Sequence, residues 1–125
     1  MSATVYLVED DASVRKGLDR LLRSAGYRVE SLDSASAYLA RATVARPACL
    51  VLDIRMPGMS GFELQRAIAG TVLARPIVFI TGHGDEDIRM RALSTGAVDV
   101  LFKPIDEAVL IEAVERALHS AALSN

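Results

Sequence analysis

Short apolar runs alternate five times with stretches of helical pattern along the 125 residues of this chain. The apolar runs are four to six residues long, which is short enough for buried strands. Between and after these runs, apolar residues recur every three or four positions, as on one face of a helix. The expected strands are Val5–Val8, Tyr27–Leu32, Leu50–Asp53, Ile77–Thr81 and Val98–Phe102.

Capping residues indicate where the helices between these strands begin and end. Gly26 and Gly96 are placed to close the first and fourth helices, because glycine readily takes the left-handed backbone of a helix end. Ser34 is expected to cap a short second helix. The segment Ser60–Glu63 has the spacing of a capping box and predicts the start of the third helix. The fourth helix is expected over Asp85–Ser94, and a long helix ends the chain.

This alternation predicts an α/β fold, with a doubly wound parallel sheet of five strands and helices on both faces. Because crossovers are right-handed, the expected topology is flavodoxin-like, (βα)5, with strand order 2-1-3-4-5. The second strand is the most polar and is expected at an edge, whereas the third is apolar throughout and is expected in the centre. Residues 1–125 are expected to form a single domain with loose ends at 1–3 and 120–125.

Composition and charge exclude several classes of function. A formal net charge of −2 provides no bulk attraction to nucleic acid. The chain has no apolar run near the roughly 20 residues of a membrane span, so no membrane partner is expected. Its start lacks the pattern of a signal peptide. The single cysteine, Cys49, is expected to be a buried hydrophobe that fits a reducing cytoplasm.

Acidic, hydroxyl and amine side chains follow the expected strands. Asp10 and Asp11 come after the first strand, and Asp53 and Thr81 end the third and fourth. Lys103, one of only two lysines beside twelve arginines, follows the fifth. Because parallel strands bring their C-terminal ends to one edge of the sheet, these side chains are expected to converge. Three carboxylates, a hydroxyl and an ammonium suit a divalent metal and a phosphoryl group.

Two roles follow for the carboxylates. Adjacent acids repel one another in a partly dry pocket, and a hard cation removes that repulsion. We therefore expect Mg²⁺, which prefers oxygen ligands and keeps some waters, to be bound by two or three of the carboxylates of Asp10, Asp11 and Asp53, with the well-placed backbone carbonyl of Arg55. Asp11 has a second interpretation, as the cap of the first helix. Asp53 is held by rigid backbone and is the candidate nucleophile that would become an acyl phosphate, with Lys103 beside it.

Taken in order, these motifs resemble the receiver (CheY-like) domain of two-component response regulators, over the range from Thr4 to about Leu118. The motifs Thr81–Asp85 and Gly96–Asp99 are most similar to the FixJ-type branch of that family. The matching stretches are Val8-Glu9-Asp10-Asp11, Leu52-Asp53-Ile54-Arg55-Met56-Pro57-Gly58-Met59-Ser60-Gly61, Ile80-Thr81-Gly82-His83-Gly84-Asp85, Gly96-Ala97-Val98-Asp99 and Phe102-Lys103-Pro104.

The resemblance implies a phosphorylation-controlled switch and not an enzyme. A sensor histidine kinase would transfer a phosphoryl group to Asp53 in a Mg²⁺-dependent reaction, with at most slow self-phosphorylation and self-dephosphorylation. Thr81 and Lys103 would contact the phosphoryl group. The fourth helix, fifth strand and fifth helix would then change shape or pair in a homodimer.

The resemblance also implies partners outside this chain. Members of the FixJ-type branch usually carry a C-terminal helix-turn-helix domain, so the expected output is transcription regulation. Any contact with DNA would be made through that absent effector domain. The first helix is the usual region of kinase docking, which makes Val14, Arg15 and Leu18 candidate contacts, although core packing is favoured for Val14 and Leu18.

Two departures from the family pattern concern the output, and one further residue, His83, is expected beside the phosphoryl group. Val100 occupies the position of the usual aromatic residue three places before the lysine. Glu86-Asp87-Ile88 stands where the branch often has an apolar residue and proline, and Arg89-Met90-Arg91 follows, so the fourth helix carries more charged residues than that pattern. They are either a solvated face or an altered partner surface. His83 is either a simple loop residue or an activator of water.

Three rival functions fit the residues less well. A phosphatase of the haloacid dehalogenase type would need an aspartate where Arg55 stands. A flavodoxin-like cofactor binder would end its first strand in a phosphate-binding loop, and here that strand ends in acids. A stand-alone or degenerate receiver that acts only as an interaction module remains an alternative, although Asp10, Asp11, Asp53, Thr81 and Lys103 are all present.

Overall fold

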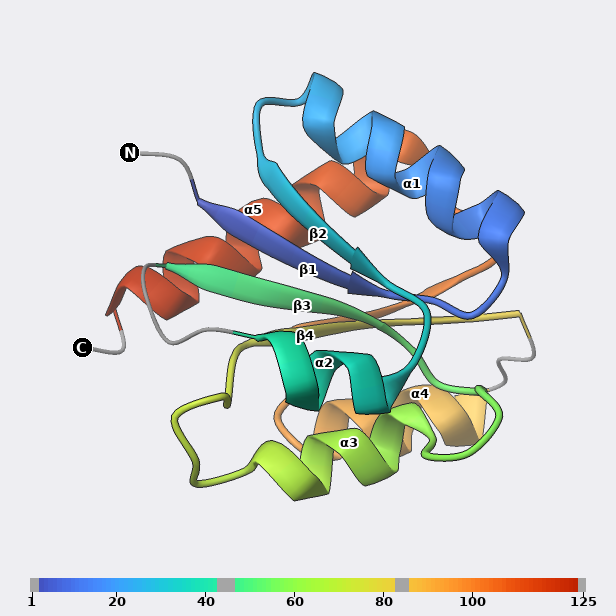
Figure 1. The fold of residues 1–125 in the computed structure, drawn as a ribbon, viewed down its shortest axis with the longest axis vertical. Coiled ribbons are helices and arrows are strands. Elements are labelled where there is room, and N and C mark those ends of the chain that lie inside the picture. Colours follow the sequence, from blue (N-terminus) through green and yellow to red (C-terminus); the bar gives the residue numbers. More distant parts are fainter. Residues whose placement is uncertain (1–2, 43–46, 83–85, 124–125) are drawn as a thin grey trace.

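A five-stranded parallel sheet with helices on both faces forms the core of the computed structural model, which describes residues 3–42, 47–82 and 86–123 (Figure 1). The strands are β1 (Thr4–Val8), β2 (Arg28–Leu32), β3 (Ala48–Asp53), β4 (Ile77–Thr81) and β5 (Asp99–Phe102). The helices are α1 (Ala12–Ser24), α2 (Ala35–Arg41), α3 (Gly61–Ile68), α4 (Glu86–Ser94) and α5 (Glu107–Leu123).

The strand order is β2-β1-β3-β4-β5, and every neighbouring pair is parallel, so the predicted topology is confirmed. The register aligns the strand ends: Val8 lies opposite Leu32 and Leu52, and Thr81 lies opposite Phe102. The residues that leave β1, β3, β4 and β5 therefore meet at one edge of the sheet. Among the residues predicted from the sequence, Asp10, Asp53, Thr81 and Lys103 lie at that edge.

Two apolar layers lie on either side of the sheet. One packs under α1 and α5, and the other packs under α2, α3 and α4 (Figure 1). All six residues of β3 are buried, as expected for a central strand, whereas β2 alternates buried with exposed positions, as expected for an edge. Cys49 on β3 is fully buried, and burial raises the pKa of its thiol to about 12. It is therefore an inert core residue.

The helix ends confirm the predicted caps. The hydroxyl of Ser34 accepts a hydrogen bond from the N–H of Ala37, and Ser60 and Glu63 form the predicted capping box of α3. Gly26 and Gly96 take the left-handed backbone, with φ of 99° and 95°.

Some element bounds differ from the sequence prediction. The fourth helix is described from Glu86, and its expected start at Asp85 lies outside the described residues. Helix α5 continues to Leu123, into the segment that was expected to be a loose end. Within the described part of the chain, no helix combines the length and apolar character that crossing a membrane requires.

Candidate functional site

Three carboxylates form a cluster at the C-terminal edge of the sheet. Glu9 and Asp10 leave β1, and Asp53 is the last residue of β3, the strand beside it. One carboxylate oxygen from each lies within 4.8 Å of the others. The parallel register places these residues together because Val8 and Leu52, which precede Glu9 and Asp53, are paired across the two strands.

The structure does not bring Asp11 into this cluster. Its exposed carboxylate turns to α1, where Oδ1 accepts a hydrogen bond from the N–H of Val14 at 3.1 Å. Glu9, which the sequence interpretation left out of the metal set, is fully buried at the site instead. Because α1 begins at Ala12, Asp11 is the N-cap, and the two acids that join the cluster are Glu9 and Asp10, one position earlier than predicted. The start of the helix was the signal that could have identified Glu9.

Lys103 reaches the cluster from the far side. Its Nζ lies 2.6 Å from Oε1 of Glu9 and 3.5 Å from Oδ2 of Asp53. Burial lowers the pKa of the lysine, but the bonds and charges of Glu9 and Asp53 outweigh it, so its pKa is raised. Lys103 is therefore a fixed positive charge that faces two of the three carboxylates.

Thr81 lies between Asp53 and Lys103 in the order of the strands. It is the last residue of β4 and is only 1% exposed. Its carbonyl accepts a hydrogen bond from the N–H of Lys103 at 2.8 Å, which fixes the start of the β5–α5 loop against β4. The structure thus places Asp53, Thr81 and Lys103 at the ends of three successive strands, as the sequence predicted.

The environment of the Asp53 carboxyl disfavours its charged form. Burial, followed by the neighbouring Glu9, raises its pKa to about 7, against the opposing effect of Lys103. Oε1 of the buried Glu9 is in ion-pair contact with Lys103. Among the described residues, no donor makes a hydrogen bond of good geometry to this oxygen. Three carboxylates against one ammonium leave excess negative charge among oxygen donors. This donor set fits a hard divalent cation, so the acidic cluster could bind a metal.

A tight loop after β3 supports Asp53. The N–H of Arg55 donates to Oδ1 of Asp53 at 3.3 Å, and the N–H of Gly61 donates to the carbonyl of Ile54 at 2.9 Å. A Cβ at Gly61 would lie 2.5 Å from the backbone oxygen of Asp53, so only glycine permits this approach of α3 to the strand. The role of the Arg55 carbonyl as a metal ligand stays a prediction.

Arg15 fixes the backbone of the acidic turn. Its Nη1 donates to the carbonyl of Glu9 at 2.8 Å and lies 3.4 Å from that of Asp10. The N–H of Asp11 donates to Oε2 of Glu9 at 3.0 Å. Sequence reasoning missed this role for Arg15, because nothing in the helical pattern shows that its side chain turns back toward β1.

The other residues singled out from the sequence lie around this site. Leu18 is buried in the core and Val14 packs against it, so core packing accounts for both. Val100, at the position of the usual aromatic residue, is 1% exposed. His83 lies outside the described residues.

A family model of the response regulator receiver domain matches residues 5–115. The chain belongs to this family. Receiver domains of response regulators are signalling switches.

Relatives of this receiver domain include longer regulators. It is 45% identical over 114 residues to the transcriptional regulatory protein FixJ of Rhizobium meliloti (strain 1021), covering 91% of this chain and 56% of that protein. It is 41% identical over 119 residues to the response regulator protein TmoT of Ectopseudomonas mendocina, covering 95% and 54%. The chain therefore spans about half the length of these relatives.

Solved structures similar to this receiver domain share its whole fold. FixJ-N superposes with a TM-score of 0.85 at 43% identity, covering 95% of both chains. The response regulator StyR superposes with a TM-score of 0.88 at 48% identity, covering 98% of this chain and 62% of that one. The chemotaxis protein CheY4 of Vibrio cholerae, at 29% identity, has a TM-score of 0.84 and covers 94% of this chain and 99% of that one.

Proposed function

We propose that this receiver domain, spanning residues 1–125, accepts a phosphoryl group on Asp53 from a sensor histidine kinase and thereby controls an effector. One observation carries the proposal: the buried carboxyl of Asp53 ends β3 inside a cluster with Glu9 and Asp10 and faces Lys103. The cytoplasm is the proposed location, in keeping with the single buried thiol.

Mg²⁺ is the proposed cofactor, held by the carboxylates of Glu9, Asp10 and Asp53 and by the Arg55 carbonyl. When bound, the ion would shield the negative charge between the carboxylates and the incoming phosphoryl oxygens. Asp11 leaves this proposed set, since its carboxylate caps α1. All the proposed donors are oxygens, which suits Mg²⁺.

In the proposed transfer, a carboxylate oxygen of Asp53 forms a bond to phosphorus as the bond from phosphorus to the imidazole nitrogen of the kinase breaks. The imidazole leaves with the electron pair of that bond, and Asp53 becomes an acyl phosphate. The backbone of β3 and the Arg55 N–H orient the attacking carboxyl. Slow transfer from small phosphodonors and slow loss of the phosphoryl group to water belong to the same proposal.

Lys103 and Thr81 are proposed to contact the new phosphoryl group. The ammonium of Lys103 already lies 3.5 Å from Asp53 and would pair with a phosphoryl oxygen. The hydroxyl of Thr81, at the end of the neighbouring strand, would donate to another. These contacts would draw β4 and β5 toward the phosphate and shift the equilibrium between two conformations.

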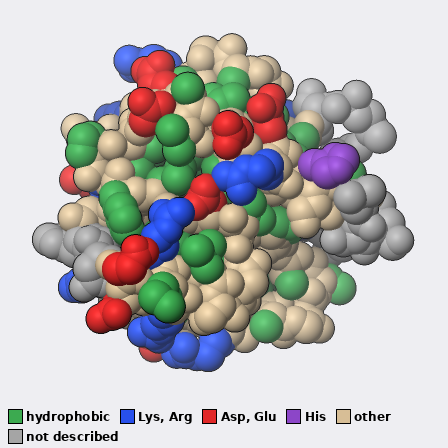
Figure 2. Space-filling view, turned by 180° about the vertical axis from the view of Figure 1, so that it is seen from behind, with side chains coloured by type: hydrophobic (Ala, Val, Ile, Leu, Met, Phe, Trp, Pro, Cys, Tyr) green, Lys and Arg blue, Asp and Glu red, His purple; other side chains and the backbone are tan. Residues whose placement is uncertain are grey.

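The proposed output is transcription regulation through a separate effector domain, because the similar FixJ is a transcriptional regulatory protein and is longer than this chain. A homodimer through α4, β5 and α5 is proposed on phosphorylation. Met90, Leu93, Phe102 and Val109 are exposed apolar residues on these elements. Seen from the back, apolar side chains are interspersed with charged ones (Figure 2).

Intact mass tests the proposal. We expect the purified chain to gain about 80 Da, one phosphoryl group, with acetyl phosphate or a phosphorylated kinase and Mg²⁺. The gain should disappear with a chelator, with brief base treatment and in Asp53→Asn. An unchanged gain in Asp53→Asn would contradict the assignment.

A further inference from the structure

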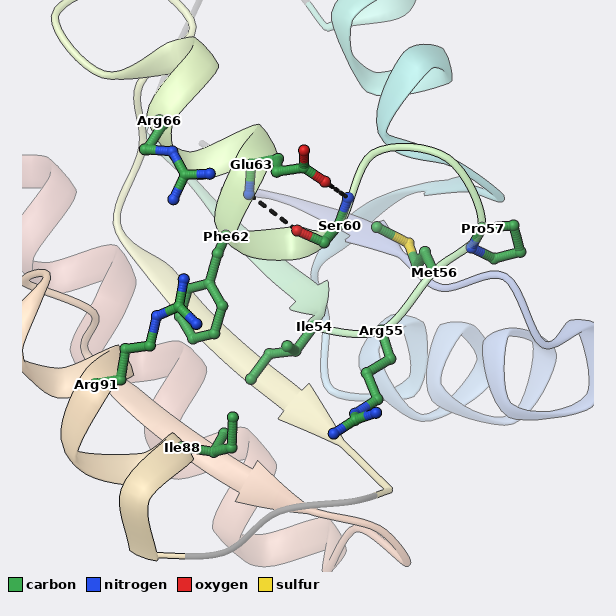
Figure 3. Close-up of a pocket in the computed structure, with 10 residues that line it drawn as sticks. All are labelled: Ile54, Arg55, Met56, Pro57, Ser60, Phe62, Glu63, Arg66, Ile88 and Arg91. Atoms are coloured by element: carbon green, nitrogen blue, oxygen red, sulfur yellow. Dashed lines mark hydrogen bonds between the residues drawn. The ribbon is translucent and has the colours of Figure 1, made fainter.

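A groove of about 660 Å³ lies between the β3–α3 loop, α3 and α4, beside the phosphorylation site but separate from it (Figure 3). One wall begins at Ile54, directly after β3, and continues along the loop to Ser60. The opposite wall is formed by Ile88 and Arg91 of α4. Neither Lys103 nor the carboxylate cluster lines this groove.

The floor of the groove is apolar. The ring of Phe62 packs on the ring of Phe79, with centroids 5.0 Å apart, and is fixed in the core below α3. In Figure 3, Ile54 and Ile88 extend into the space beside this ring from opposite walls. Ile54 and Phe62 are each only 5% exposed, so a ligand in the groove would rest on a floor that is already packed, with the half-buried Ile88 beside it.

Three exposed arginines surround this floor. Arg91 holds its guanidinium carbon 4.2 Å from the centre of the Phe62 ring. In Figure 3, Arg66 and Arg91 lie on the same side of the groove with Phe62 between them, and Arg55 lies across from them. No ion pair joins any of these three guanidiniums to a carboxylate of residues 3–42, 47–82 or 86–123. Their hydrogen-bond donors are thus available to an acidic ligand.

Glu63, an acid on the rim of the groove, is already engaged. Its Oε1 accepts a hydrogen bond from the backbone N–H of Ser60 at 2.9 Å, and the hydroxyl of Ser60 accepts from the N–H of Glu63 (Figure 3). This capping box satisfies the N-terminus of α3 from within. An acidic ligand would therefore be bound by the arginines. Three arginines against one glutamate give the groove a positive charge, although the whole domain has a net charge of −2.

We propose that this groove binds an acidic peptide segment of a partner protein, in which carboxylates flank one or two apolar side chains. The apolar side chains would pack against the half-buried Ile88, beside the buried Phe62 ring, and the carboxylates would pair with Arg66 and Arg91 in the fork geometry that guanidinium favours. A free inorganic anion would leave the apolar floor exposed. Arginine and aromatic residues are also enriched in the hot spots of protein interfaces.

The groove shares a loop with the phosphorylation site. Arg55 lines the groove, and its backbone N–H donates to Oδ1 of Asp53 at 3.3 Å. Peptide binding and phosphorylation would consequently change each other's equilibrium by the same factor. That coupling rests on the proposed function. Peptide binding to the unphosphorylated domain does not depend on the proposed function, so either proposal can fail without the other.

Titration of the unphosphorylated domain with a synthetic peptide, followed by amide NMR shifts and calorimetry, tests the proposal. The peptide carries acidic residues around two leucines, and its counterpart has serines in place of the leucines. We expect Arg66→Gln and Arg91→Gln each to weaken binding about fivefold or more, and Arg20→Gln to change it less than about twofold. Arg20 is a matched control because it is an exposed arginine on α1, outside the groove. The serine counterpart should bind more weakly, and added salt should weaken both peptides.

Several results would overturn the proposal. No binding to the folded wild-type domain at millimolar peptide would do so, as would equal losses in Arg20→Gln and Arg66→Gln, or equal affinity for both peptides. Full competition by inorganic phosphate at a similar concentration would show that only an anion is bound. Because Arg91 packs on Phe62, the thermal stability of each variant is measured alongside the titration. If Arg91→Gln lowers stability, the peptide affinity of Arg66→Gln decides the test.

Discussion

The Nζ of Lys103 lies 2.6 Å from a carboxylate oxygen of Glu9, nearer than its 3.5 Å from Asp53. The shorter of the two contacts of the lysine is thus with the acid from β1. A phosphoryl group on Asp53 would compete with Glu9 for the same ammonium. Glu9 has a double role in this account, as a ligand of the cation and as the resting partner of Lys103.

Substitutions at Glu9 and Asp11 should separate metal binding from helix capping. Glu9→Gln should lower Mg²⁺ affinity about tenfold or more, because it removes a buried carboxylate from the cluster. Asp11→Ala should leave Mg²⁺ affinity within about threefold and lower the free energy of unfolding by about 1 kcal/mol, through loss of the cap. Calorimetric Mg²⁺ titration and urea unfolding measure the two effects. The reverse pattern would restore Asp11 to the metal set.

The metal-free protein should lose stability as pH rises through the titration of Asp53. The pKa of this carboxyl is raised from 3.8 to about 7 in the fold, so the folded state holds a proton that the unfolded state releases. The contribution of Asp53 is most favourable below pH 4 and is lost as pH rises to about 7. We expect Asp53→Asn to remove this slope and to be more stable than wild type at pH 8.

Urea unfolding of both proteins in chelator, across pH 4 to 8, gives the difference between them. Subtracting the variant removes the slopes that all other carboxylates contribute. A difference that does not change with pH would contradict the raised pKa. Addition of Mg²⁺ should then stabilise the wild type more than the variant, since a ligand that binds only the folded state stabilises it.

Arg15 should act on the metal site through the backbone that it fixes. Removal of its guanidinium in Arg15→Ala releases the carbonyls of Glu9 and Asp10 and should weaken Mg²⁺ binding about tenfold. Arg20→Ala, on the same helix but without these bonds, should have no such effect. Equal Mg²⁺ affinity of the two variants would show that the turn holds its shape without Arg15.

Two glycines offer opposite expectations for the same substitution. In Gly61→Ala the new methyl would lie 2.5 Å from the backbone oxygen of Asp53, so the loop must shift and the free energy of unfolding should fall by about 2 kcal/mol or more. Gly17 lies inside α1 with nothing within 4 Å of its Cβ position. Gly17→Ala should raise stability by about 0.5–1 kcal/mol. Thermal unfolding compares them, and a neutral Gly61→Ala would contradict the close approach described for α3.

The sequence predicted the sheet because strand length, helical spacing and caps all agreed, as at Ser34 and Ser60. The order of the strands was predictable because right-handed crossovers leave few alternatives. The choice among Glu9, Asp10 and Asp11 was not predictable, because three adjacent acids show no periodicity. The start of α1 decides which two of them join the cluster with Asp53. The groove beside Phe62 depends on how α3 and α4 pack against each other. The sequence pattern of each helix alone does not predict that packing.

Chemical location of the phosphoryl group tests the central claim most directly. The domain is phosphorylated by a sensor histidine kinase with Mg²⁺, reduced with borohydride, digested and analysed by mass spectrometry of its peptides. Reduction of an acyl phosphate converts aspartate to homoserine, so the account predicts homoserine at position 53, with Asp10 and Asp11 unchanged. Homoserine at another acid, or phosphate that resists reduction and base, would contradict it.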